Sequence, residues 1–147
     1  MPRAIDEIAA DFDALTVRDF DYAISNSQGW DRLQELCDEM LAMSDPAVCA
    51  PIMLRTIERL DGVDLGTPGP LVHAMESWNG GYEKLLADSV RRKPTPLSVW
   101  MVNRIINATP LEAESWMTLL QSVTNNPAAS DETKTQAKDF IAFQTRA

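Results

Sequence analysis

Few residues in this sequence could carry out chemistry. There is one histidine, His73, and there are two cysteines, Cys37 and Cys49. These three residues cannot complete a zinc site without further ligands, so metal chemistry is nearly excluded. We interpret both cysteines as reduced thiols in the core, although antiparallel helices on either side of residues 44–45 would let them approach and form a disulfide. No feature near either cysteine indicates the lowered thiol pKa that Cys–His catalysis needs.

Two further patterns fit structure better than ligand binding. The loop from Gly62 to Gly69 lacks the GxGxxG spacing and the lysine of a phosphate-binding loop, and its proline Pro68 removes a backbone donor. His73 and Glu76 are three residues apart, but a di-iron bundle needs two such pairs in the opposite order and two more carboxylates. The sequence therefore predicts a protein that is not an enzyme and that carries no metal or cofactor.

The clearest chemical feature is an acidic N-terminal half. Residues 1–66 contain 14 acidic and 5 basic side chains, whereas residues 67–147 contain 8 of each, so the first part accounts for the whole net charge of −9. Such a field repels nucleic-acid phosphates and attracts basic partners. We therefore expect a basic protein partner and no direct nucleic-acid binding. A merely solvated surface that keeps the protein soluble is the simpler interpretation.

Acids with the right spacing to bind a partner lie in the predicted helix at 30–43. Asp31, Glu35 and Asp38 recur at i, i+4 and i+7, opposite an apolar stripe, and should project from one outer face. Aromatic side chains beside the Asn79–Gly81 segment could be interface anchors, although core positions are favoured for them. The candidate partner-binding residues are Asp31, Glu35, Asp38, Glu39, Asp61, Asp64, Trp78 and Tyr82.

Arg104 is a charged residue inside the most apolar segment of the chain, which runs from Leu97 to Ile106. A charge in that setting must find a partner or reach the surface. We predict an internal polar network in which Glu76 is the partner of Arg104, with a ligand site as the alternative. The same apolar pattern predicts that Trp100 is fully buried.

Helical periodicity dominates the sequence, and no segment shows sustained strand alternation. Pro46, Pro96 and Pro110 each follow a capping side chain and mark helix starts, and Thr109 and Glu112 have the spacing of a capping box. Around a central helix at Leu97–Ile106, we predict helices at about residues 4–14, 17–26, 30–43, 46–60, 70–79, 81–92, 110–124 and 131–143.

Two details of these helices can be predicted from single residues. Pro51 lies inside the 46–60 segment, where it should bend the helix or delay its start. Ser130 follows a break in the pattern and can cap the last helix.

The predicted fold is all-α and forms a single helical domain over residues 1–147. Short links at 44–45 and 108–109 should force antiparallel helix pairs. Pro46 and Pro96 stand at equivalent starts in a HEAT-like arrangement of stacked antiparallel helical hairpins. A compact helical bundle is the alternative.

The sequence also indicates where the protein acts. It has no apolar stretch near the roughly 20 residues that span a bilayer. Its N-terminus turns acidic where a secretory signal would carry an apolar core. We therefore expect a cytoplasmic protein that does not enter the membrane.

One part of the chain resembles a family of bacterial immunity proteins. The resemblance is carried by the stretch from Leu65 to Glu76, by Tyr82 and Leu85, and by the segment from Arg92 to Asn107. Proteins of this family accompany polymorphic toxins and contact-dependent growth inhibition toxins. The resemblance implies a small cytosolic helical protein, often HEAT-like, that binds one cognate toxin domain and blocks its activity.

Residues that the chain shares with this family look like scaffold, because several fall in its most apolar part. They are Gly69, His73, Glu76, Arg104 and Asn107. Many toxins of the systems that the chain resembles are nucleases, which bind phosphate through lysine and arginine. Carboxylates of an acidic inhibitor could occupy those positions. The alternatives are a helical adaptor or scaffold for an endogenous cytosolic partner, and an enzyme acting on a small molecule.

Overall fold

The computed structural model describes residues 3–21, 23, 28–43, 45–66, 69–77 and 81–146, with side chains omitted at 46 and 47. All regular structure in these residues is helical, which confirms the predicted all-α class. The chain divides into two compact units, Met1–Glu83 (unit 1) and Lys84–Ala147 (unit 2). The sequence predicts one domain over residues 1–147. Whether the two units form one domain depends on their relative placement, so this stays a prediction.

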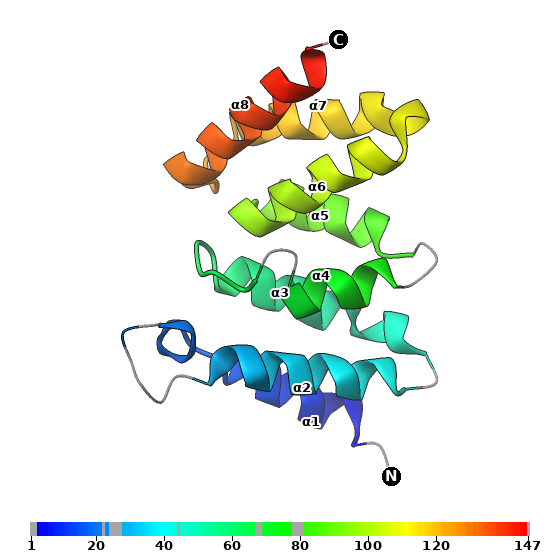
Figure 1. Cartoon of the computed structure of the whole chain (residues 1–147), viewed down its shortest axis with the longest axis vertical. Helices are drawn as coiled ribbons and strands as arrows, with labels where there is room; N and C mark the ends of the chain where they lie inside the picture. Colours follow the sequence, from blue (N-terminus) through cyan, green and yellow to red (C-terminus); the bar gives the residue numbers. More distant parts are fainter. Residues whose placement is uncertain are drawn as a thin grey trace. The chain divides into compact units, whose positions relative to one another are not determined.

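Unit 1 is built around the helix that carries the predicted acidic face. Its elements are α1 (Ile5–Asp13), the 3-10 helix η1 (Val17–Phe20), α2 (Gly29–Leu41), the 3-10 helix η2 (Pro46–Cys49), α3 (Ala50–Arg59) and α4 (Gly69–Glu76). The central helix α2 packs against α1 and α4, and α1 also packs against α3. Figure 1 shows α1 and α2 running in opposite directions, as do α2 and α3.

The N-terminus of α2 is fixed by a close approach of two backbones. Gly29 is buried, and a Cβ atom at this position would collide with the backbone carbonyl of Asp19 in η1. The ring of Trp30 meets Phe20 edge to face, with 5.5 Å between the ring centroids. Helix α2 therefore begins at a glycine because no larger residue fits beneath η1.

Unit 2 contains three helices that pack against one another. Its elements are α5 (Glu83–Arg92), α6 (Pro96–Ala108), the 3-10 helix η3 (Pro110–Glu112), α7 (Ala113–Val123) and α8 (Asp131–Thr145). Helices α6, α7 and α8 contact each other pairwise. Consecutive members of this set run in opposite directions (Figure 1), as the short link at 108–109 predicts.

Hydrogen bonds at two helix starts match the sequence patterns. The Thr95 hydroxyl oxygen accepts from the Ser98 backbone N–H at 3.2 Å, and the Thr95 N–H donates to the Ser98 hydroxyl at 3.0 Å. At α8, the Ser130 hydroxyl oxygen accepts from the Thr133 backbone N–H at 3.1 Å. The two-way cap at Thr95 and the one-way cap at Ser130 each satisfy backbone N–H groups that have no acceptor inside their own helix.

The predicted capping box at Thr109 is wrong. Its hydroxyl donates to the Ile105 carbonyl at 2.7 Å instead of capping the next helix. Residues Pro110–Glu112 form a 3-10 turn, and α7 begins at Ala113. The Ile105 carbonyl also accepts the Thr109 backbone N–H at 2.8 Å, so the backbone and the side chain of Thr109 both bond to the end of α6.

Two of the predicted helices are shorter than expected. The segment at 46–60 opens with η2, and α3 begins only at Ala50, so that Pro51 lies in its first turn and removes no helical hydrogen bond. This is the delayed start that Pro51 predicts. The segment at 17–26 is helical only as far as Phe20, because Asp21 has extended backbone angles. Residues 22 and 24–26 of that segment lie outside the described residues.

Trp100 is not fully buried, so the prediction for this residue is wrong. Its side chain is half-buried on α6, while Val99 and Val102 beside it are fully buried. The Arg104 guanidinium carbon lies 4.9 Å from the centroid of the Trp100 ring. A cation one turn along the helix thus covers one face of the ring, where the apolar pattern predicted a neighbouring helix.

Candidate partner-binding surface

Helix α2 presents the three predicted carboxylates on one exposed face. Its buried side is formed by Leu33, Leu36, Cys37 and Met40. Asp31, Glu35 and Asp38 are all exposed on the opposite side. The amphipathic geometry that the sequence predicts for this helix is therefore present, and we call these three residues together the acidic face.

An ionic network joins α2 to α1 beside this face. The Nε and Nη2 atoms of Arg3 donate to the two carboxylate oxygens of Glu39, each at 2.8 Å. Arg3 also reaches Asp11 at 2.6 Å, and Arg32 reaches the same Asp11 oxygen at 2.7 Å. Arg32 in turn pairs with Glu35 at 3.1 Å. Asp11 is thus the centre of a chain of five alternating charges.

Arg3 alters the proton affinity of its two carboxylate partners. Hydrogen bonding to Arg3 holds the pKa of Glu39 and that of Asp11 below their usual ranges. The same hydrogen bonds raise the pKa of Arg3. The charged forms of Arg3, Asp11 and Glu39 are therefore favoured.

The network divides the predicted acidic residues of α2 into two kinds. Glu35 and Glu39 are each paired with an arginine of this chain. Asp38 accepts a hydrogen bond from the uncharged Gln34 amide at 2.9 Å, and Asp31 makes no ion pair with any other described residue. Asp31 and Asp38 are therefore the carboxylates most available to a cation from outside.

Asp64 lies next to the start of α2 because of a hydrogen bond that the sequence does not suggest. The Trp30 indole N–H donates to the Asp64 backbone carbonyl at 3.0 Å. The Asp64 carboxylate is exposed and accepts from the Gly66 backbone N–H at 3.0 Å. The predicted extension of the acidic field by Asp64 is thus geometrically reasonable, whereas Asp61 is half-buried and less accessible.

The aromatic candidates contribute less to this surface. Tyr82 is buried, with 6% of its surface exposed, which favours a packing role over that of an interface anchor. Trp78 lies outside the described residues. A role for either residue in binding a partner stays a prediction.

Both cysteines are buried free thiols, as predicted. Burial raises the pKa of Cys37 to about 12, with a smaller contribution from the neighbouring Asp38 charge, and burial also raises the pKa of Cys49. A protonated, buried thiol is a poor nucleophile. Within the described residues, no group of three or more histidine, cysteine, aspartate or glutamate side chains could hold a metal ion.

The residues interpreted as scaffold occupy different environments. Asn107 is exposed, but its amide oxygen and that of Asn103 each accept from the Gln144 amide at 2.8 Å, which ties α6 to α8. His73 is exposed on α4. Pairing of Arg104 with Glu76 stays a prediction.

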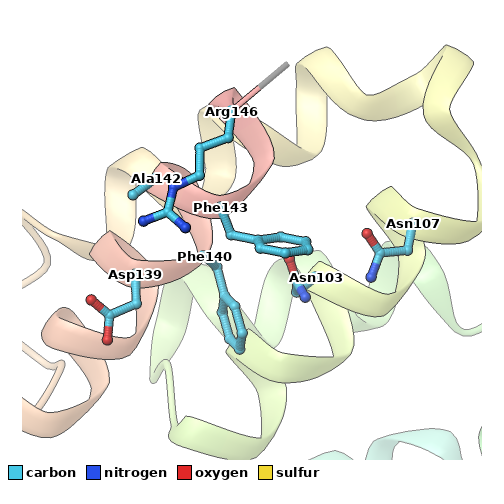
Figure 2. Close-up of a pocket in the computed structure, with 7 residues that line it drawn as sticks. All are labelled: Asn103, Asn107, Asp139, Phe140, Ala142, Phe143 and Arg146. Carbon is cyan, nitrogen blue, oxygen red and sulfur yellow. The ribbon is translucent and has the colours of Figure 1, made fainter.

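A groove in unit 2 was not anticipated from the sequence. It lies between α6 and α8 and has a volume of about 500 Å³. Figure 2 shows its lining residues, which are Asn103, Asn107, Asp139, Phe140, Ala142, Phe143 and Arg146. Phe143 is 57% exposed. The available signal was a large apolar residue, Phe143, between Asp139 and Arg146 on one face of the last helix.

Comparison with known proteins gives no further identification. Neither a protein-family model, nor a curated protein, nor a solved structure matches this chain. Among the described residues, no helix is both long enough and apolar enough to cross a membrane.

Proposed function

We propose that this chain is an immunity protein that binds a cognate bacterial toxin domain in the cytosol and blocks its active site. The favoured partner is a basic nuclease. The observation that supports this proposal best is the acidic face of α2, where three exposed carboxylates stand opposite a buried apolar stripe. The motif resemblance over residues 65–107 supplies the class of partner.

Charge distribution supports a basic partner for unit 1. This unit contains 16 acidic and 5 basic side chains and has a net charge of −11, whereas unit 2 contains 6 acidic and 8 basic side chains and has a net charge of +2. A strongly negative surface accelerates encounter with a positively charged protein. A nuclease presents such a surface because it must bind phosphates.

The ionic network supports rigid presentation of these acids. Arg32 and Arg3 fix Glu35 and Glu39 on α2, and Asp11 fixes both arginines to α1. Side chains that are ordered before binding lose less conformational entropy in the complex. The network therefore holds Glu35, one of the three residues of the acidic face, and fixes the helix that carries the face against α1.

A helical adaptor for an endogenous partner is the alternative that the same acidic face permits. The proposal predicts a toxin gene beside this one, and the two functions are separated by a growth experiment in which that toxin domain is expressed with and without the chain. An immunity protein restores growth only against its own toxin. Failure to restore growth, with the chain present in soluble folded form, would favour the adaptor.

A further inference from the structure

The outer surface of α8 carries a small group of charged and apolar side chains that has no assigned role within unit 2. Asp139, Ala142, Phe143 and Arg146 are all exposed and lie within one 100° sector of the helix, given 3.6 residues per turn. Figure 2 shows Asp139, Ala142 and Arg146 on one side of α8, whereas the Phe143 ring extends across the groove toward Asn103 of α6. We call these four residues the α8 face.

Its two charges are not neutralised by neighbouring side chains. Asp139 and Arg146 make no side-chain hydrogen bond or ion pair with another described residue. Both nevertheless line the groove that Phe140 and Phe143 make apolar. An occupant of this surface should therefore carry a base, an apolar group and an acid in that order along its length.

The α8 face itself has that order when it is read in the opposite direction. If two copies of α8 pack antiparallel about a twofold axis between residues 142 and 143, Asp139 of each copy faces Arg146 of the other. In the same register, the small Ala142 of each copy faces the Phe143 ring of the other. A twofold interface requires this kind of self-complementary pattern, in which every contact occurs twice.

We propose that the α8 face is a homodimerisation surface and that its occupant is a second copy of this chain. Two reciprocal Asp139–Arg146 ion pairs set the register, and two Phe143 rings lie over Ala142 at the rim of the groove. This assignment is independent of the proposed toxin partner, because it uses the other unit of the chain.

Charge also favours unit 2 as the place where copies meet. Two copies of a chain with a net charge of −9 repel each other, and unit 1 accounts for all of that negative charge. Unit 2 has a net charge of +2, and the α8 face is neutral. Contact through α8 therefore brings together the parts of the two copies that repel each other least.

The dimer should be weak. In the proposed register, the two helices overlap only over their last two to three turns, which is less than the roughly 800 Å² per partner of a standard interface. Association should therefore become visible between about 10 µM and about 1 mM protein. Screening should weaken it further at high salt, because the ion pairs lie at the surface.

Charge reversal provides a sharp test by analytical ultracentrifugation of the full chain. D139R places two arginines opposite each other in a homodimer, and R146D places two aspartates opposite each other, so each variant alone should be monomeric. An equimolar mixture of the two should associate, because both ion pairs reform between unlike copies. The double variant D139R/R146D should also associate, since the swap preserves self-complementarity.

Matched controls separate register from general charge effects. E132R reverses an exposed charge on the same helix outside the overlap and should dimerise like the wild type. F143A should weaken association without any change of charge. Far-ultraviolet circular dichroism confirms that every variant remains folded, which is expected because all the substituted side chains are exposed.

Two results would overturn the proposal. One is a wild type that remains monomeric up to about 1 mM at low salt, which would leave the α8 face to a different protein. The other is a mixture of D139R and R146D that associates no better than either variant alone, which would exclude this register.

Discussion

Arg3 holds Glu39 through two parallel hydrogen bonds of 2.8 Å, although 36 residues separate them in the sequence. The same guanidinium reaches Asp11 at 2.6 Å, so one residue joins the start of the chain to both α1 and α2. This bidentate geometry is the strongest form of an arginine–carboxylate contact. It makes α2 a fixed support for the acidic face.

Replacing Arg3 by glutamine should lower the stability of the protein at neutral pH and make that stability less dependent on pH. Arg3 depresses the pKa of Asp11 and of Glu39 in the folded state. A depressed carboxylate contributes stability above its unfolded pKa and loses it as the pH falls through the folded pKa. The difference in melting temperature between wild type and R3Q should therefore be largest near pH 7 and shrink below about pH 4.

A control variant identifies the cause of that effect. R91Q removes an arginine that pairs only with Asp88 on its own helix, among the described residues, and should change the pH profile little. A constant difference between wild type and R3Q from pH 7 to pH 3 would show that Arg3 acts through packing and not through its charge.

Gly29→Ala should destabilise unit 1 even though alanine is the better helix former. The added Cβ would collide with the backbone carbonyl of Asp19, so η1 must move away from α2. We expect a net loss of about 1–3 kcal/mol in the free energy of unfolding, measured by urea titration. Asp31→Ala, at an exposed site two residues further on, is the control. Equal stability of G29A and wild type would show that η1 shifts at no cost.

Trp100→Ala should cost less than Leu120→Ala, although the removed side chain is larger. Leu120 is fully buried, and its truncation should cost about 2–5 kcal/mol. Trp100 is half-buried, and a cation covers one face of its ring. We expect a loss of about 1–2 kcal/mol for W100A, most of it from area burial and the cation–π contact. Urea midpoints of the two variants give the comparison, and the reverse order would contradict it.

The Thr95 and Thr109 side chains should respond differently to truncation. Thr95 is buried and takes part in a capping box, so T95A should cost about 1–2 kcal/mol. Thr109 is exposed and bonds backwards to Ile105, so T109A should cost less than about 0.5 kcal/mol. Thermal unfolding of both variants measures the difference. Similar losses would mean that Thr109 caps α7 after all.

The helices and the face of α2 could be predicted because they depend on local periodicity. An apolar stripe at i, i+3, i+4 and i+7 fixes which side of a helix is buried, and the acids then fall on the other side. The Thr95 cap and the delayed start at Pro51 follow from single residues with strong positional preferences. These features need no knowledge of distant contacts.

The missed features depend on contacts between distant segments or on competition between local motifs. Nothing near Arg3 in the sequence points to Glu39. The Thr109 motif fits a capping box equally well, but its hydroxyl donates to the Ile105 carbonyl at the end of α6. Trp100 has apolar neighbours in the sequence, yet it is only half-buried and the Arg104 guanidinium lies over its ring.

The acidic face of α2 is tested most directly by the affinity of the chain for the toxin domain that the proposal predicts beside its gene. The variant D31N/E35Q/D38N keeps the shape of the face and removes its charge. It should bind at least about 30-fold more weakly, equivalent to about 2 kcal/mol, with slower association and a smaller dependence on salt. The control E112Q/E114Q/E132Q removes the same charge from exposed sites in unit 2 and should bind like the wild type. Unchanged affinity and unchanged salt dependence of the first variant would contradict the proposal and show that the acidic face is only solvated surface.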